Sequence, residues 1–261
     1  MILTLYFTKD ESSFNPYSLR SVINQEGVIQ EIYVVSASPI DLGKYGFNIP
    51  NIVVPTKQPW PVPVRVGFSF NVALKLINKN LNNYDYIFKV DGDVILPKDY
   101  LKNIIDSKPL IAGYGPSMLI STKFFMVILR NKYPINYCDD GYIIAVAIAK
   151  GIWPQTDIKD MKIPQVVTIS SREYIYGVEY YKWGMPLPFL LIHPITRIYL
   201  KLTRKIKEVQ KKSFSAYLWN IVGYLHAALN RERRYYFHRE YSRMRILYTY
   251  HTLQSLRGLK G

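Results

Sequence analysis

Two aspartates separated by one glycine, Asp91-Gly92-Asp93, are the residues of this chain best suited to hold a divalent cation. They directly follow an apolar stretch, Tyr-Ile-Phe-Lys-Val, that has the composition of a buried strand. Glycine permits a tight backbone turn, and carboxylate oxygens are hard ligands that suit Mg²⁺ or Mn²⁺. Such a metal can bridge the phosphates of a nucleotide diphosphate and neutralise charge on a departing diphosphate. The alternative is a solvated acidic turn, because the tripeptide alone is weak evidence.

A second acidic pair, Asp139 and Asp140, follows the only cysteine, Cys138, and precedes an apolar run at 143–149. Adjacent carboxylates repel each other, which raises the pKa of one of them and favours a base-like group if the pair is partly buried. The alternative is helix capping, because aspartate at the start of a helix stabilises it without any chemistry.

Three apolar segments have the composition of strands, and each runs into a polar loop. The strands are expected at 2–8, 31–36 and 86–90, and the loops at 8–13, 36–41 and 91–93. Helical spacing in between predicts an α/β fold with a mostly parallel central sheet flanked by helices. Ligands gather at the carboxyl ends of the strands of such a sheet, so the three loops are expected to converge on one site.

The helices that separate these strands are expected at 17–26, 67–81 and 97–105. Between the second strand and the second helix, residues 50–63 hold five prolines. Proline is excluded from helix interiors and central strands, so this segment is predicted to be an extended connection.

The runs 71–74 and 84–101 together resemble family 2 glycosyltransferases. In that family, a helix with an Asn-x-Ala/Gly-Leu signature leads into a strand, an Asp-x-Asp and a helix with a Leu-Pro-x-x-Tyr-Leu pattern. Residues 18–25 are also similar to the first helix of the family, and the match covers most of 1–155. The resemblance implies a Rossmann-like GT-A fold and an inverting transfer of sugar from a nucleotide-diphosphate sugar to a hydroxyl acceptor.

The resemblance also implies roles for individual residues. Asp93, assisted by Asp91, would hold the Mn²⁺ or Mg²⁺ ion. Asp140 would be the general base that deprotonates the acceptor hydroxyl, with Asp139 as its helper. The nucleotide contacts would come from Thr8, Glu11, Ser36, Arg65, Asn71 and Asp91.

The chain departs from the family pattern at several positions. The family usually has an aspartate near Ser36 and an arginine where Phe70 stands, so the identity of the nucleotide base stays open. Some members supply a late histidine to the metal, which residues 169–172 lack, and His193 is a candidate by type only. The loop 111–117 resembles the glycine-bearing loop on the acceptor side of the family, with a simple turn as the alternative.

Charge divides the chain unevenly. The net charge is +15, and residues 1–170 carry 17 basic and 14 acidic groups, whereas 171–261 carry 17 basic and 5 acidic groups. This predicts a catalytic domain at 1–170 and a basic, amphipathic helical extension at 171–261 that faces an anionic partner. A surface merely rich in Lys and Arg is the alternative. A single cysteine excludes an intramolecular disulfide framework and is compatible with the reducing cytosol.

Residues 213–229 contain no formally charged side chain and are bracketed by basic residues. The segment is at the lower length limit for a membrane span and contains polar residues, so a helix lying in the membrane interface is expected instead. This predicts a cytoplasmic protein, peripheral at the inner face of the membrane, and the resemblance favours a lipid-linked or glycan acceptor. A helix pair packed on the catalytic domain is the alternative.

Two other functions compete with a transferase. A sugar-phosphate nucleotidyltransferase would carry a glycine-rich phosphate loop after the first strand, whereas residues 8–11 contain no glycine. A non-catalytic basic protein that binds a membrane or nucleic acid would use the basic tail, but it has no need of acidic pairs at two element boundaries. No nucleic-acid partner is therefore expected.

Overall fold

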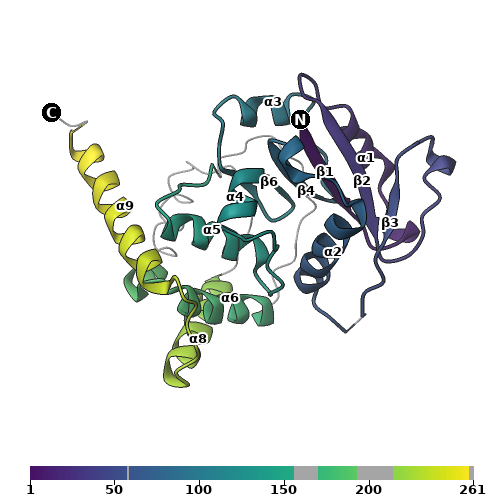
Figure 1. Ribbon diagram of the computed structural model, residues 1–261. Helices are drawn as coiled ribbons and strands as arrows, with labels where there is room; N and C mark the ends of the chain where they lie inside the picture. Colours follow the sequence, from purple (N-terminus) through teal and green to yellow (C-terminus); the bar gives the residue numbers. More distant parts are fainter. Residues whose placement is uncertain (58, 156–169, 193–213, 259–261) are drawn as a thin grey trace. The chain divides into compact units, whose positions relative to one another are not determined.

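The computed structural model describes residues 1–57, 59–155, 170–192 and 214–258 (Figure 1). The chain separates into two compact units. The first comprises Met1–Ile144 with Trp153–Pro164, and the second comprises Ala145–Ile152 with Gln165–Gly261. The predicted boundary at residue 170 stays a prediction.

The first unit is built around a six-stranded sheet with the order β3-β2-β1-β4-β6-β5 (Figure 1). Its strands are β1 (Ile2–Phe7), β2 (Gln30–Ser36), β3 (Asn51–Val53), β4 (Tyr86–Asp91), β5 (Ile111–Tyr114) and β6 (Ser117–Ser121). The first four are parallel to one another, whereas β6 runs antiparallel to both β4 and β5. The predicted α/β class with a mostly parallel central sheet is confirmed.

Helices cover both faces of this sheet. They are α1 (Pro16–Ile23), α2 (Val62–Ile77), α3 (Tyr100–Ile105) and α4 (Thr122–Val127), with short 3₁₀ helices at Glu11–Ser13, Gly43–Tyr45 and Leu81–Asn83. Helix α5 (Asp139–Ala149) begins in the first unit and ends in the second. On one face, Leu19 of α1 and Leu101 of α3 are buried in one cluster with Phe88 of β4. On the other face, the ring of Phe70 in α2 stacks on that of Phe7 in β1, with 6.0 Å between centroids. Alternation along β4 places Lys89 and Asp91 on the α2 face.

The proline-rich segment differs from its prediction. It contains β3, which is tolerated because β3 lies at the edge of the sheet. Helix α2 begins at Val62, five residues before the expected start, because proline fits the first turn of a helix and Pro63 lies there. The helix ends at Ile77, before the expected 81, where Asn78 takes a left-handed conformation with φ of 47°.

The described part of the second unit is helical, with α6 (Ser170–Trp183), α8 (Phe214–Leu229) and α9 (His238–Gly258). Helices α6 and α8 pack backbone to backbone. A Cβ atom at Gly177 would lie 2.0 Å from the Asn220 carbonyl oxygen, and one at Gly223 would lie 2.0 Å from that of Tyr174. Only glycine fits at these two positions. Within the described residues, no helix is both long and apolar enough to cross a membrane.

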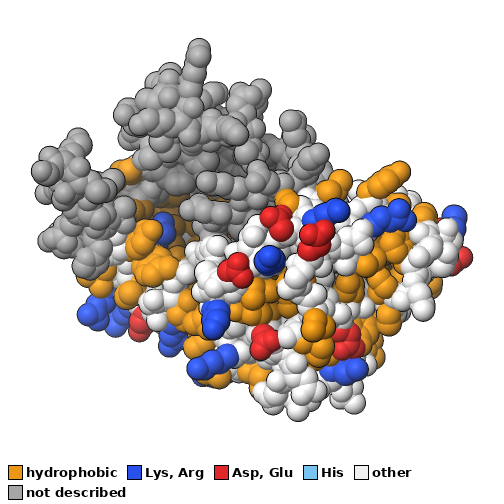
Figure 2. Space-filling model, turned by 90° about the horizontal axis from the view of Figure 1, so that it is seen from above, with side chains coloured by type: hydrophobic (Ala, Val, Ile, Leu, Met, Phe, Trp, Pro, Cys, Tyr) orange, Lys and Arg blue, Asp and Glu red, His pale blue; other side chains and the backbone are white. Residues whose placement is uncertain are grey.

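Charged side chains of both signs are interspersed with hydrophobic ones on the face of the molecule that Figure 2 shows. Residues 193–213, which include His193 and the densely basic run 201–212, lie outside the described residues.

Candidate active site

The Asp-Gly-Asp turn lies at the carboxyl end of β4, next to the end of β1. The hydroxyl of Tyr6 donates a hydrogen bond of 2.9 Å to the Gly92 carbonyl. A Cβ at Gly92 would lie 2.8 Å from the Phe7 carbonyl oxygen and 3.1 Å from Thr8 Cβ. Glycine is therefore required here by close packing and not by the backbone conformation, because the φ of Gly92 is not positive. Asp93 is exposed at its tip, where a cation can reach it.

Lys89 belongs to the candidate site, although it is not among the site residues predicted from the sequence. It lies in the interior of β4 and is only 3% exposed, although lysine is rarely buried. Its Nζ donates to the Gly115 carbonyl at 2.6 Å and pairs with Asp91 Oδ1 at 2.8 Å. Burial lowers the pKa of Lys89, but the carboxylates of Asp91 and Asp139 raise it by more than burial lowers it. The pKa is therefore raised overall, and the group is charged. A lysine at an inward position of an otherwise apolar strand was the signal available in the sequence.

The second acidic pair lies at the start of α5, and each carboxylate has a defined partner. Asp139 is 6% exposed and accepts a hydrogen bond of 2.8 Å from the Tyr133 hydroxyl. Asp140 Oδ2 accepts one of 2.9 Å from the Gly115 backbone N–H. The Gly115 carbonyl thus accepts a hydrogen bond from Lys89, and the Gly115 N–H donates one to Asp140. The structure brings the two predicted acidic pairs together through this one residue, which favours a role beyond helix capping.

Negative charge exceeds positive charge among these side chains. Burial raises the pKa of Asp91, Lys89 lowers it, and the neighbouring Asp93 and Asp140 raise it again, with a net rise. Burial, opposed by Lys89 and reinforced by Asp140, raises the pKa of Asp139 to about 6. Three carboxylates, those of Asp91, Asp139 and Asp140, thus act on a single buried ammonium, and Asp93 adds a fourth negative charge beside Asp91. A divalent cation with oxygen ligands fits this arrangement in charge and in donor chemistry.

Within the described residues, no group of three or more His, Cys, Asp or Glu side chains is arranged to hold a metal ion. Asp91 and Asp93 would therefore hold a cation as a pair of carboxylates. Such a pair suits Mg²⁺ in particular, which is usually bound by one or two carboxylates together with water and substrate phosphates.

The raised pKa of Asp139 makes the stability of the metal-free protein depend on pH. The rise from 3.8 to about 6 favours the protonated carboxyl in the folded state. The protonated carboxyl contributes up to about 3 kcal/mol to the free energy of unfolding. This contribution is complete below about pH 4 and is lost as the pH rises through about 6. Asp139→Asn keeps an acceptor for Tyr133, so we expect this variant to match the wild type at pH 4 and exceed it at pH 7.5. Urea unfolding with a chelator present measures this.

A matched control is Asp106→Asn, which changes an exposed carboxylate. This control is expected to keep the wild-type pH dependence. The assignment is wrong if Asp139→Asn loses the same stability as the wild type between pH 4 and pH 7.5.

Three predicted nucleotide-binding residues lie at the carboxyl ends of β1 and β2: Thr8 and Glu11 follow β1, and Ser36 is the last residue of β2. Thr8 is in packing range of Gly92, as described above, and its hydroxyl is 3.5 Å from that of Ser13. Glu11 pairs with Lys44 at 3.0 Å. Ser36 is buried, and its hydroxyl lies 2.7 Å from the Ser38 carbonyl and 2.9 Å from Asn51 Oδ1. The structure places Thr8 beside the Asp-Gly-Asp turn, whereas Ser36 is engaged with its own loop and the start of β3.

Asn71 and Arg65 lie on α2. The Asn71 amide donates to the Tyr133 carbonyl at 2.9 Å and accepts from its N–H at 2.8 Å, so it holds the loop that precedes the second acidic pair. The helix lies directly on this loop, because a Cβ at Gly67 would be 2.3 Å from the Pro134 carbonyl oxygen. Arg65 Nε is buried without a hydrogen-bond partner. The predicted nucleotide contacts of both residues stay predictions.

The predicted acceptor-side loop at 111–117 is a β-hairpin in which Gly115 and Pro116 join β5 to β6. Gly115 has φ of +41°, and a Cβ there would lie 3.3 Å from Asp140 Oδ2. Glycine therefore allows both the backbone conformation and the approach of Asp140. The hairpin lies beside Asp140, the predicted base, and its position near an acceptor stays a prediction.

Comparison with known proteins gives matches among solved structures only: no protein-family model and no curated protein sequence matches the chain. The structure of S. aureus TarS 1-349 in complex with UDP is 14% identical and has a TM-score of 0.47, with 68% of this chain and 63% of that chain covered. The mannosyltransferase PcManGT from Pyrobaculum calidifontis, in complex with GDP-Man and Mn²⁺, is 13% identical with a TM-score of 0.47 over 93% and 83% of the two chains. An active-site mutant of LgtC is 16% identical with a TM-score of 0.32 over 46% and 57%.

The chain thus spans less than two thirds of the TarS fragment. Because these TM-scores are below 0.5, the matches support no conclusion about the function of this chain. What the chain does has to follow from its own residues.

Proposed function

We propose that this chain is an inverting, metal-dependent glycosyltransferase of the GT-A type that uses a nucleotide-diphosphate sugar as donor. One observation carries the proposal: two acidic pairs from separate elements converge on Gly115, one through Lys89 and the other through Asp140. One pair suits a cation and the other suits a proton acceptor. A protein that only binds an anionic surface has no use for such a cluster.

Asp93 and Asp91 would hold Mn²⁺ or Mg²⁺. When bound, the ion supplies Lewis-acid stabilisation of the charge that develops on the diphosphate leaving group. Asp93 is exposed at the turn and is placed to meet a ligand from solvent, whereas Asp91 is held by Lys89. The rigid attachment of the turn to β1 through Tyr6 keeps both carboxylates in place.

Asp140 would act as the general base. The Gly115 N–H fixes one of its oxygens, Oδ2, which orients the carboxylate and leaves the other oxygen to take the proton of the acceptor hydroxyl. The acceptor oxygen then forms its bond to the anomeric carbon as the bond to the diphosphate breaks, which inverts the configuration. Asp139, held by Tyr133, would position this end of α5 and place a second carboxyl beside Asp140.

The donor nucleotide would lie across the ends of β1 and β4. Thr8 and Glu11 are on the loop after β1, next to the Asp-Gly-Asp turn, and Arg65 offers a cation from α2. Ser36 and Asn71 would contribute through the loops that they hold.

A thermal-shift screen of UDP-, GDP- and dTDP-sugars, with and without Mn²⁺, tests the donor and metal assignments together. We expect one donor to raise the melting temperature by several degrees only when Mn²⁺ is present. Asp93→Ala should abolish this shift, because it removes the exposed carboxylate of the metal pair. Asp106→Ala, an exposed aspartate elsewhere in the same unit, is the matched control. A donor-induced shift that survives in Asp93→Ala would contradict the proposal.

We also propose that the protein is peripheral at the cytoplasmic face of a membrane and acts on a lipid-linked or glycan acceptor. Five apolar side chains of α8 are exposed at helical spacing, namely Leu218, Trp219, Val222, Leu225 and Leu229. Exposed apolar residues on a helix next to arginines are typical of an interfacial helix. A basic protein that binds nucleic acid stays the alternative.

A further inference from the structure

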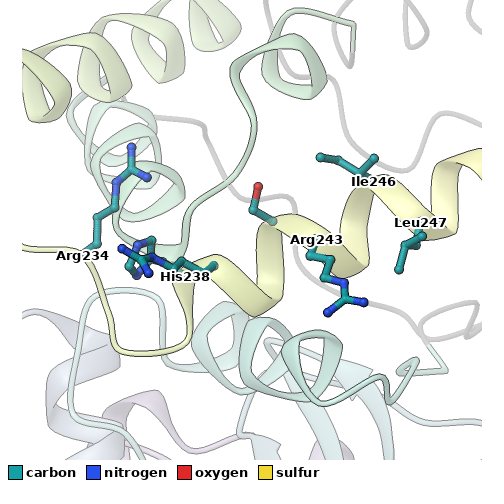
Figure 3. A pocket seen from close by; sticks show the side chains of 7 residues that line it. Arg234, His238, Arg243, Ile246 and Leu247 are labelled. Atoms are coloured by element: carbon teal, nitrogen blue, oxygen red, sulfur yellow. The ribbon is translucent and has the colours of Figure 1, made fainter.

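The second unit carries a surface hollow of about 660 Å³ on one side of α9 and the turn before it (Figure 3). It is lined by Arg234, His238, Arg239, Ser242, Arg243, Ile246 and Leu247. The segment 231–245 that contributes most of this lining holds six arginines, two glutamates and no lysine. A basic surface that served solubility alone would have no reason to exclude lysine.

Three arginines in the hollow are available to a ligand. Arg239 and Arg243 are exposed and lie four residues apart, so they share one face of α9. Arg234 enters from the preceding turn, and its guanidinium lies 4.4 Å from the centroid of the Tyr181 ring, which restrains it. Within the described residues, none of the three forms an ion pair with a carboxylate. The planar guanidinium presents paired donors that match the oxygens of a phosphate.

Apolar side chains continue the same surface. Ile246 and Leu247 line the hollow one turn beyond Arg243, and they are 51% and 39% exposed. Figure 3 shows Arg243, Ile246 and Leu247 following one another along the helix. A ligand that is both anionic and apolar meets this combination better than a free anion or a nucleic-acid backbone. The boundary between phospholipid headgroups and acyl chains has that chemistry.

We propose that this hollow binds the phosphate group of an anionic phospholipid and holds the second unit at a membrane surface. The inference rests on the membrane association proposed above and is independent of the transfer chemistry. It assigns the contact to a defined group of arginines instead of to the net charge of the chain.

Flotation of the full chain with two kinds of vesicle tests the proposal: phosphatidylcholine alone, and phosphatidylcholine mixed with phosphatidylglycerol. We expect the wild type to bind the mixed vesicles, and Arg239→Gln/Arg243→Gln to bind them at least about tenfold more weakly. The matched control is Arg231→Gln/Arg233→Gln, which removes two exposed arginines outside the hollow and changes the charge equally. Equal loss in both double variants would overturn the proposal, since it would indicate attraction by net charge alone.

Further measurements distinguish a phospholipid from other anionic ligands. Inorganic phosphate that raises the melting temperature of the wild type, without any preference for the anionic vesicles, would overturn the lipid assignment. Binding of duplex DNA that depends on Arg239 and Arg243, with no vesicle binding, would do the same. Arg239→Lys/Arg243→Lys keeps the charge and the helix, and we expect it to bind mixed vesicles more weakly than the wild type; equal binding would overturn recognition through the guanidinium fork.

The thermal shift with donor and Mn²⁺ is measured on the same variants. We expect it to be unchanged, since the hollow lies outside the acidic site. Loss of vesicle binding with an intact donor shift supports the hollow, whereas failure of the donor shift in the wild type concerns the proposed transferase alone.

Discussion

Asp140→Asn is expected to lower the rate of sugar transfer by about 10²–10⁴-fold, the usual contribution of a general base. The amide oxygen can still accept the hydrogen bond from the Gly115 N–H, which now holds Asp140 Oδ2 at 2.9 Å. The fold of the hairpin and the start of α5 should therefore persist. What the amide lacks is the ability to take a proton from the acceptor hydroxyl.

Two measurements separate this loss from a loss of binding. The metal-dependent thermal shift with the donor should be the same in Asp140→Asn as in the wild type, whereas turnover with acceptor should collapse. Asp139→Asn is the neighbouring comparison, and we expect it to reduce turnover less, because its side chain is buried and held by Tyr133. Normal turnover in Asp140→Asn would show that the base lies elsewhere.

Lys89→Met is expected to make the stability of the protein depend on a divalent cation. Removing the buried ammonium leaves the half-buried Asp91 carboxylate without its ion-pair partner and the Gly115 carbonyl without a donor. Breaking a fully buried pair from one side costs about 3–5 kcal/mol, and the cost is smaller here because the Asp91 side chain is 34% exposed. The metal-free variant should therefore unfold much more readily than the wild type.

Binding of Mn²⁺ should change in the opposite direction. A positive charge close to the cation site opposes a second one, so we expect Lys89→Met to bind Mn²⁺ at least about tenfold more tightly and to recover stability when it does. Calorimetric titration with Mn²⁺ and melting with and without the ion measure both effects. Lys75→Met makes the same substitution at an exposed position of α2 and should change neither. A purely structural lysine would lower stability in Lys89→Met without altering the Mn²⁺ affinity, and that result would refute its electrostatic role.

Much of the fold could be predicted because its signals are local. Strands β1, β2 and β4 are short apolar runs that end in polar loops, and the structure confirms them within one residue at either end. The hairpin β5–β6 was predicted only as a loop, because its pairing with β4 is antiparallel and joins segments far apart in the sequence. The early start of α2 was missed because prolines were interpreted as breakers, although they are well tolerated in the first helical turn.

The candidate site was predictable in its acidic residues and not in its connections. Asp91 and Asp93 are conspicuous in sequence because they follow an apolar strand and surround a glycine. That Lys89 and Gly115 link them to Asp140 depends on which face of β4 a side chain occupies and on the antiparallel return of β6. Both are properties of tertiary packing, so no local sequence pattern predicts them.

The Asn71 amide holds the backbone of Tyr133 through two hydrogen bonds. This connection affects how any mutational survey of the protein should be interpreted. Tyr133 in turn donates a hydrogen bond to Asp139, so α2, where the donor is proposed to bind, is connected to the carboxylate beside the proposed base. An Asn71 variant with poor turnover has two possible origins, a weakened donor and a displaced proton acceptor. Separate saturation curves for donor and acceptor distinguish them, whereas a single activity score would merge two different defects under one label.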